Sequence, residues 1–372
     1  MVRLGVAACV IGEHLVPGDV EVEEGVVAGV GLPPGDPDLI AVPGFLDVHF
    51  HGHAGTEFTA ATVPEHRDLA RRITATGVTA YQPTLWSMPL DVTVEALARH
   101  PGEVHGGARV LGFHLEGPFL SQGKIGAHKP ENLLPPSPEV AGRLIEAGPV
   151  DQITIAPELD GALETIAYLL SRDVTVSLGH SLATSEETKR ALALGAQAFT
   201  HVFNAMRPFD HRDPGILGTA LAGDEAYLTA IFDGVHFSDE AGVSLIRCAG
   251  DRLVAITDGT AATGTSSTTV VLGGLECSIV DGAPRHPDGT IAGSILTMDA
   301  ALRKLVSLGL EVPRAVQAVS TNPARLAKRQ DLGLLGVGRP ADIAVLDASL
   351  RVVSTLVAGV EVFDRDRGHR HN

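Results

Sequence analysis

The chain has 372 residues, 44% of them hydrophobic, which is enough for a large buried core and exceeds one small domain. Its formal net charge is −17 and its 28 Lys and Arg residues form no run, so nucleic acid and anionic membrane surfaces are not expected partners. The three cysteines are far apart and form no CxxC pair, which predicts no disulfide framework and favours a reducing, cytoplasmic location.

In chain order, residues 1–43 contain short strand and turn patterns, and the apolar start lacks the cleavage site of a signal peptide. No apolar stretch of about 18 residues follows, so no membrane span is expected. From residue 44 onward, eight short apolar runs alternate with helical patterns. These runs are 45–51, 78–85, 110–116, 153–158, 174–180, 198–204, 227–236 and 253–258.

Eight strands with helices between them predict an α/β fold, specifically a (β/α)8 TIM-like barrel. An open doubly wound sheet is the rival, but no GxGxxG motif opens a helix after a strand. Residues 1–43 plus 335–372 are predicted to form one small β-sandwich domain beside a catalytic barrel of residues 44–334. Residues 265–287 form a hairpin-like insertion, and the polar tail 364–372 is expected to fray.

Residues with metal-binding or acid–base side chains recur at the predicted strand ends. His49 and His51 are two apart on strand one and so point to the same side. The others are Glu116 closing strand three, His180 closing strand five, His201 on strand six and Asp258 closing strand eight. A lone buried histidine is usually an ordinary core residue, but a barrel gathers all six of these residues at its C-terminal face. This set predicts the site of a metal-dependent hydrolase.

Several longer motifs resemble one family. They are His-Leu-Glu-Gly-Pro-Phe at 114–119, Gly-Ala-His at 126–128, Leu-Gly-His-Ser at 178–181, Thr-His-Val-Phe-Asn-Ala-Met at 200–206, Asp-Gly-Val-His at 233–236, Thr-Asp at 257–258, Ala-Gly-Ser at 292–294 and the strand 338–346. Together they resemble the N-acetylglucosamine-6-phosphate deacetylases of the amidohydrolase superfamily, in order and over nearly the whole chain.

The resemblance implies a divalent metal site with one or two ions per subunit. Glu116, His180 and His201 would hold the main ion, and His49 and His51 a second one with Glu116 as a bridge. Strand four lacks the lysine that many other amidohydrolases use as a carboxylated bridge. Zinc is the first choice and iron the alternative, because N and O ligands suit both.

The resemblance also implies the catalytic groups. Asp258 would act as general base and return the proton to the leaving amine, and His128 would stabilise the oxyanion. Gly259, directly after Asp258, departs from the family pattern and predicts a looser strand end. The Gly- and Pro-rich stretch 120–136 is interpreted as a lid.

Substrate contacts follow from the same resemblance. The backbone amides of Asn204 and Ala205 would bind a phosphate, together with Arg212 contributed by the neighbouring subunit of a homodimer. The remaining substrate contacts would be Ala127, His128, His236, Ile291, Ala292 and Gly293.

The predicted reaction is hydrolysis of N-acetylglucosamine 6-phosphate to glucosamine 6-phosphate and acetate. Another N-acyl hexosamine phosphate, such as the galactosamine epimer, is the first alternative substrate. A barrel that has lost activity and serves as a binding protein is the second alternative, and it would be expected to lack a ligand or the base.

Overall fold

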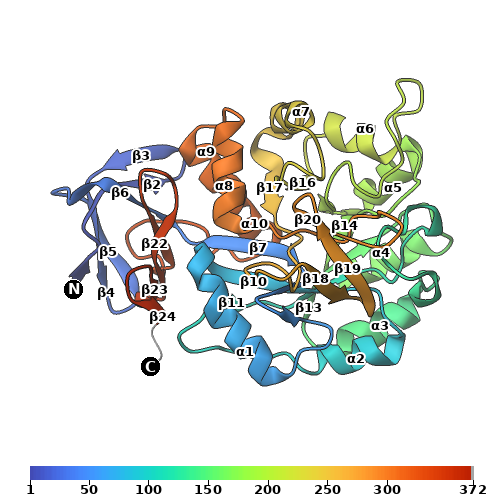
Figure 1. Cartoon of the computed structure of the whole chain (residues 1–372). Coiled ribbons are helices and arrows are strands. Elements are labelled where there is room, and N and C mark those ends of the chain that lie inside the picture. The colour runs from blue at the N-terminus through green and yellow to red at the C-terminus, as the bar shows by residue number, and fades with distance from the viewer. Residues whose placement is uncertain (370–372) are drawn as a thin grey trace.

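The computed structural model describes residues 1–369 and contains the predicted (β/α)8 barrel (Figure 1). Strand β10 lies between β7 and the two pieces of the third strand, β11 and β12, and the parallel order continues from β12 to β17. The barrel strands are β7 (Phe45–Phe50), β10 (Val78–Leu85), β11 (Arg109–Val110), β12 (Phe113–Glu116), β13 (Val150–Ile155), β14 (Thr175–Leu178), β15 (Ala198–Phe199), β16 (Tyr227–Ile231) and β17 (Leu253–Ile256).

The first and last barrel strands meet just where both end. The backbone N–H of Asp258 donates to His49 O at 2.9 Å, and His51 N–H donates to Gly259 O at 2.7 Å. The barrel strands are wholly buried apart from a few residues, because helices cover their outer side and side chains fill the interior.

Six of the eight predicted strand ends were placed too late, among them those of the runs that carry His180, His201 and Asp258. Strand β14 stops at Leu178 and β15 at Phe199, so His180 and His201 lie in turns beyond them, as Asp258 does beyond β17. All three residues have positive φ, with values of 48°, 32° and 49°. A strand cannot continue through a left-handed residue, which explains the difference.

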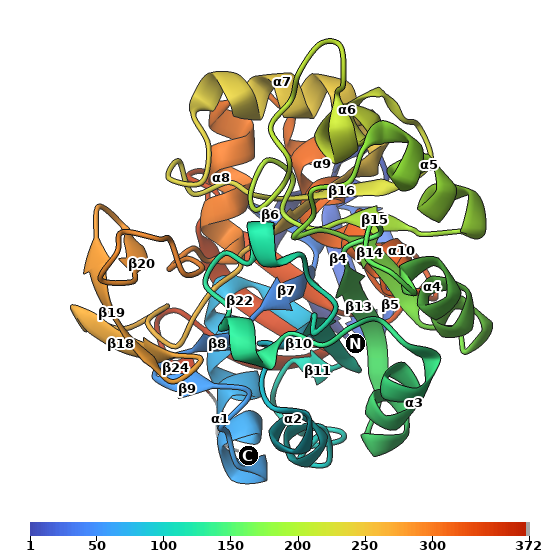
Figure 2. The ribbon, with the colours of Figure 1, turned by 90° about the vertical axis from the view of Figure 1, so that its right-hand side faces the viewer.

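The helices surround the strands, as Figure 2 shows for α1 to α8. Their bounds are α1 (Val63–Arg72), α2 (Leu90–Leu97), α3 (Pro138–Ala147), α4 (Ala162–Ser171), α5 (Ser185–Leu194), α6 (Gly215–Ala222), α7 (Asp239–Ala249), α8 (Met298–Ser307), α9 (Val312–Val316) and α10 (Asn322–Leu326). Helices α1 and α5 each begin with a capping box, Thr62 with Glu65 and Thr184 with Glu187. Each box satisfies two backbone donors at the helix start.

Both chain ends build the small β-domain, which lies at one end of the barrel (Figure 1). Its seven-stranded sheet has the order β24-β23-β22-β21-β6-β2-β3, and β21 joins the C-terminal part to β6 through antiparallel pairs such as Ile343↔Pro43. The members are β2 (Val6–Ile11), β3 (His14–Pro17), β6 (Asp36–Pro43), β21 (Ile343–Leu346), β22 (Val352–Val357), β23 (Val360–Asp364) and β24 (Gly368–His369).

A second sheet of the β-domain contains β1 (Val2–Arg3), β4 (Asp19–Glu23) and β5 (Val26–Leu32). Val6 and Ile343 of the larger sheet and Val22 of the smaller one belong to a hydrophobic core separate from that of the barrel. The fraying prediction for the tail is wrong up to His369, because β24 pairs with β23. Residues 370–372 lie outside the described part of the chain.

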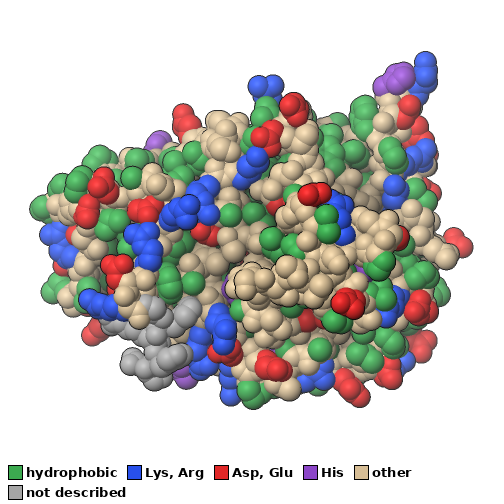
Figure 3. All heavy atoms as spheres, in the orientation of Figure 1, with side chains coloured by type: hydrophobic (Ala, Val, Ile, Leu, Met, Phe, Trp, Pro, Cys, Tyr) green, Lys and Arg blue, Asp and Glu red, His purple; other side chains and the backbone are tan. Residues whose placement is uncertain are grey.

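The predicted insertion is a three-stranded antiparallel sheet of β18 (Thr269–Leu272), β19 (Leu275–Val280) and β20 (Ala283–Arg285). A two-stranded ribbon, β8 (Gly52–His53) with β9 (Thr56–Glu57), follows the first barrel strand. On the face in Figure 3, acidic and basic side chains are interspersed. Among the described residues, no helix combines the length and apolar character that crossing a bilayer requires.

Candidate active site

The carboxylate of Glu116, at the end of β12, is the centre of the site. Its Oε1 lies 3.0 Å from His180 Nε2 and 2.9 Å from His201 Nε2. Its Oε2 lies 3.2 Å from His51 Nε2 and 3.1 Å from His128 Nε2. All five side chains are buried. One carboxylate therefore contacts imidazoles that come from four separate segments of the barrel.

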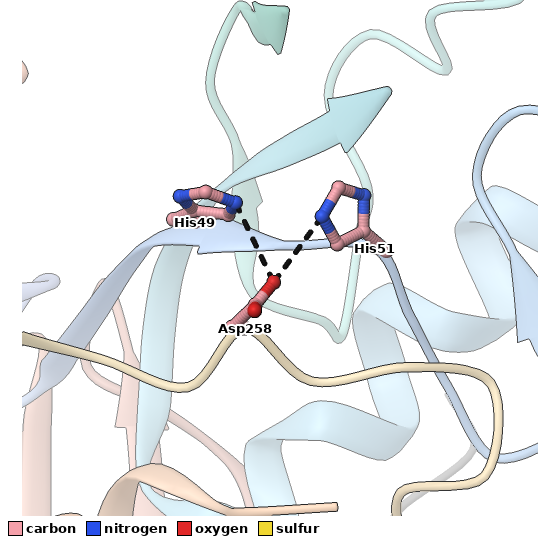
Figure 4. A group of neighbouring side chains, drawn as sticks. All are labelled: His49, His51 and Asp258. Atoms are coloured by element: carbon pink, nitrogen blue, oxygen red, sulfur yellow. Dashed lines mark ion pairs between the residues drawn. The ribbon is translucent and has the colours of Figure 1, made fainter. Parts of the chain in front are cut away.

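The carboxylate of Asp258 forms a second group with His49 and His51, next to the first. Its Oδ1 lies 3.5 Å from His49 Nε2 and 3.2 Å from His51 Nε2, and Figure 4 shows both rings turned toward this carboxylate. The ligand atoms of His49, His51 and Asp258 lie within 4.8 Å of one another, as do those of Glu116, His180 and His201. The structure thus places two three-residue groups side by side, each able to hold a cation.

The donor chemistry at His180 fits a metal ion. His180 Nδ1 lies 2.8 Å from the carbonyl oxygen of Lys124, which can only accept, so this nitrogen carries the proton. In its neutral form, which is the form that can bind a metal, the ring presents an unprotonated Nε2 to Glu116 Oε1 and, at 3.1 Å, to His201 Nε2. Two acceptors facing each other are stabilised by a cation between them.

The second group supports the same conclusion. The ring nitrogens of His49 and His51 and Oδ1 of Asp258 are buried, and they make no hydrogen bond of good geometry to the described residues. Buried polar atoms without partners are rare in folded proteins, and coordination of a metal is one way to satisfy them. The residues present therefore fit one cation in each group.

His128 is held in the opposite tautomer. The backbone N–H of Ser87 donates to His128 Nδ1 at 3.2 Å, which leaves the proton of the neutral ring on Nε2. Burial is the main reason that the pKa of His128 is lowered to about 4, so the ring is neutral near pH 7. Its Nε2–H donates to Glu116 Oε2 at 3.1 Å, which places a hydrogen-bond donor of fixed orientation beside the candidate metal groups.

Both carboxylates of the site are ionised. Burial opposes the charge of Glu116, but His49 and His128 outweigh it and hold the pKa of Glu116 well below its ordinary value. Burial likewise opposes the charge of Asp258, and the nearby imidazoles of His51 and His49 keep the pKa of Asp258 below its ordinary value. An ionised Asp258 can accept a proton, as a general base must.

The turns that carry these groups are strained. Besides His180, His201 and Asp258, the left-handed region contains Phe203 and Ala205, with φ of 81° and 51°. Non-glycine residues adopt this conformation at a cost of about 1–3 kcal/mol, and such residues cluster at functional sites. Five of the twelve described non-glycine residues with positive φ thus lie where the candidate ligands leave their strands.

Gly259 does not loosen the strand end as the sequence suggested. Its N–H donates to Thr257 Oγ1 at 3.1 Å, and its carbonyl accepts from His51 and Gly52. The carbonyl of Asp258 accepts from Ser294 N–H at 2.7 Å. Asp258 is therefore fixed from both sides.

A cavity of about 380 Å³ opens above these groups. The predicted site residues that line it are Glu116, Ala127, His128, His180, His201, Asn204, Ala205, His236, Asp258, Ile291 and Gly293. His49 and His51 are buried below the cavity, and Ala292 is fully buried behind its wall with its N–H bonded to Pro284 O at 2.9 Å.

The structure places Arg212 away from its own cavity. It is exposed, on the loop that projects before α6 (Figure 1), and its backbone N–H donates to Asp210. The predicted backbone donors also differ from each other. Asn204 N–H is already bonded to His201 O at 2.9 Å, whereas Ala205 N–H has no acceptor among the described residues.

His236 is oriented by its neighbour in sequence. Its Nδ1 lies 2.7 Å from Asp233 Oδ2, and its backbone N–H donates to Asp233 Oδ1 at 3.0 Å. Burial opposes the charge of Asp233, but the hydrogen bonds from His236 hold the pKa of this carboxyl below its ordinary value. The imidazole is thus fixed in place at the cavity wall.

Trp86 and Arg285 are the two largest of the cavity-lining side chains that sequence reasoning missed. Trp86 directly follows β10, so its place at a strand end was a usable signal. Arg285 lies at the end of β20, in the inserted sheet, where no motif pointed to it. It is the only Lys or Arg among the described residues that line the cavity.

Comparison with known proteins adds independent evidence. The model of the amidohydrolase family matches residues 40–362. Human N-acetylglucosamine-6-phosphate deacetylase is 38% identical over 345 residues, covering 88% of this chain and 84% of the human protein. An N-acetylgalactosamine-6-phosphate deacetylase of Escherichia coli O157:H7 is 33% identical, covering 91% of this chain and 93% of that protein.

A solved structure is similar throughout. It is a Mycobacterium smegmatis N-acetyl-D-glucosamine-6-phosphate deacetylase mutant in complex with N-acetyl-D-glucosamine-6-phosphate. It matches with a TM-score of 0.90 and 34% identity, over 97% of this chain and 98% of that one. By sequence and by fold, the chain belongs to the amidohydrolase family and, within it, to the N-acetylglucosamine-6-phosphate deacetylases.

Proposed function

We propose that this protein hydrolyses N-acetylglucosamine 6-phosphate to glucosamine 6-phosphate and acetate. One observation carries the proposal: Glu116 and Asp258 organise two adjacent metal-binding groups below a cavity of about 380 Å³, with the Nε2–H of His128 beside them. An amide hydrolase needs these elements, namely cation sites, a base and a donor for the oxyanion.

The chain's own residues supply defined steps. Glu116, His180 and His201 would hold one divalent cation, and His49, His51 and Asp258 a second. A cation there would lower the pKa of the attacking water and polarise the amide carbonyl. Zinc is the first choice and iron the alternative.

Asp258 accepts the proton of the attacking water and passes it to the amine as the C–N bond breaks, because an unprotonated amine leaves poorly. The Nε2–H of His128 donates to the carbonyl oxygen, where negative charge develops in the tetrahedral transition state. Because the N–H of Ser87 fixes both the tautomer and the orientation of His128, the imidazole needs little reorientation during the reaction.

The phosphate requires donors at the far end of the cavity. Ala205 lines the cavity and its N–H has no acceptor among the described residues, and His236 belongs to the same lining. Arg285 adds a guanidinium from the same chain, and exposed Arg212 would reach the cavity of a neighbouring subunit in a homodimer. We place the enzyme in a reducing, cytoplasmic compartment, since its three cysteines are free.

Acetate release tests the proposal. The substrates are N-acetylglucosamine 6-phosphate and its unphosphorylated parent, with the metal content of the protein measured in parallel. Rapid release from the phosphorylated sugar alone, lost on treatment with a chelator, is expected. Metal-loaded protein that releases acetate from neither sugar would overturn the assigned substrate.

The galactosamine epimer is the second candidate substrate, because a relative of that name matches 91% of this chain. The two epimers differ in the orientation of one hydroxyl group. Comparing kcat/KM for the two 6-phosphates decides between them, and a ratio above about tenfold assigns the preference.

A further inference from the structure

Trp86 is the only tryptophan of the chain and lies against two groups of the candidate site. Its ring stacks on the imidazole of His51, with centroids 3.6 Å apart and an interplanar angle of 14°. It also meets the ring of His128 edge-on, with centroids 5.3 Å apart. The indole therefore contacts both a candidate metal ligand and the candidate oxyanion donor.

The indole also lines two cavities. One is the cavity of about 380 Å³, and the other is a small cavity of about 10 Å³ that Leu272 and His286 help to line. Trp86 belongs to a small apolar cluster with Leu272, Cys277 and Ala292, and Ala127 packs against this cluster. This apolar cluster borders the catalytic cavity next to the metal groups.

Trp86 occupies this place at an energetic cost. Its Nε1–H is buried and has no acceptor among the described residues. A buried donor without a partner costs about 1–3 kcal/mol. The fold gains packing from the indole, but a phenyl or aliphatic side chain would give similar packing without this cost, which points to a role in the site.

We propose that Trp86 forms the wall of the acyl pocket and restricts the enzyme to N-acetyl groups, an inference that rests on the proposed function. The scissile carbonyl carbon has three substituents. Its oxygen is directed to His128 and its nitrogen leads to the sugar, toward Ala205 and His236. The acyl chain then lies against Trp86 and Ala127, the apolar side chains beside His128. A chain longer than acetyl meets the indole face.

The test compares N-acetyl, N-propionyl and N-butyryl glucosamine 6-phosphate as substrates of wild-type enzyme, Trp86→Phe and Trp86→Ala. Wild-type kcat/KM is expected to fall by about tenfold or more for each added methylene that clashes. In Trp86→Ala the two cavities join, and the butyryl-to-acetyl ratio of kcat/KM is expected to rise at least about tenfold. Trp86→Phe should give an intermediate ratio.

Leu272→Ala is the matched control, because Leu272 lines the small cavity but not the catalytic one, so its truncation enlarges the small cavity and leaves the indole in place. Its selectivity ratio should match that of the wild type. Metal content is measured for every variant. A variant that loses only the acyl wall keeps its metal, whereas loss of the stacking contact with His51, a candidate metal ligand, would lower the metal content.

Binding gives a second readout that does not depend on turnover. Because Trp86 is the sole tryptophan, its emission reports on the pocket, and it should change when Asp258→Asn protein binds the N-acetyl substrate but not the N-butyryl analogue at equal concentration. Wild-type enzyme that hydrolyses all three amides equally well would overturn the inference while leaving the proposed function intact. A wild-type enzyme that releases no acid from any of them would instead overturn the proposed function.

Discussion

Asp258 combines two tasks in one carboxylate. Its Oδ1 faces His49 and His51, and its backbone is held through hydrogen bonds to His49 and Ser294. Replacement by Asn keeps the shape but removes the charge, so the side chain can no longer take a proton from water. We expect kcat for acetate release to fall by about 10²–10⁴-fold.

The metal content of Asp258→Asn distinguishes the two tasks. If the side chain acts as base, activity is lost while the Glu116, His180 and His201 group keeps its ion. Full loss of all metal from Asp258→Asn would indicate that the carboxylate mainly assembles the site. Wild-type activity in this variant would exclude Asp258 as the base.

Arg285 provides a second test at the level of one residue. If its guanidinium binds the phosphate, Arg285→Ala should raise KM for the phosphorylated sugar by about tenfold or more with little change in kcat, since a hydrogen bond to a charged group contributes about 1.5–3 kcal/mol. Lys129, which lines the neighbouring small cavity, is the matched control, and Lys129→Ala should leave KM unchanged. An equal increase of KM in both variants would indicate that any positive charge near the cavity attracts the substrate, without a specific contact from Arg285.

The difference between predicted and unforeseen residues has a physical basis. The strand-end histidines and carboxylates were predictable because period-two alternation and barrel topology together dictate where they meet. Arg285 could not be predicted, because the inserted sheet packs over the site through tertiary contacts that no local pattern encodes. Trp86 fits the strand-end rule, but an aromatic residue at such a place carries no specific chemical signal.

Among the elements, capped helices and fully apolar strands were the most predictable. Helix α5 has sharply defined ends, because Thr184 and Glu187 form a capping box at one end and Gly195 adopts a left-handed conformation at the other. Strand β15 is only two residues long, since the chain turns into the strained segment at His201. Strain of this kind depends on the assembled site and is invisible in the sequence.

Helix α1 contains a buried histidine whose titration should be visible in stability. His66 stacks on Phe58, with ring centroids 5.3 Å apart, and burial lowers the pKa of His66 to about 4. His100 and Arg99 oppose its protonation as well, whereas Glu65 favours it. The folded protein therefore binds this proton only at a pH well below that at which the unfolded chain does.

This difference in pKa determines how the stability of the protein depends on pH. Between about pH 6.5 and pH 4 the unfolded state binds the proton and the folded state does not, so stability falls as the pH falls through this window. Between pH 7 and pH 4 the titration of His66 lowers the free energy of unfolding by an amount on the order of 2–3 kcal/mol, and His66→Phe should remove this decrease. Denaturant unfolding of both proteins across this range measures it, with exposed His105→Gln as control. Parallel pH curves for wild type and His66→Phe would contradict the prediction.

At the scale of the whole molecule, the loop that projects before α6 contributes no residue to the cavity of its own subunit. Arg212 is exposed on it and does not line its own cavity, and Phe209 on the same loop is 57% exposed. An exposed aromatic residue beside an unpaired cation is typical of a surface that a partner covers. We expect a twofold-symmetric homodimer in which each loop reaches the other subunit's cavity.

Mixing two defective variants tests this arrangement. In a mixed dimer of Arg212→Ala and Asp258→Asn subunits, the site that retains Asp258 receives Arg212 from its partner, and the other site is inactive. With random assembly, about a quarter of the wild-type activity should return at low substrate concentration, because half of the dimers are mixed and each has one complete site. If Arg212 acted within its own subunit, neither site of the mixed dimer would be complete. Verified mixed dimers without any gain over the separate variants would therefore rule out an arginine contributed by the neighbouring subunit.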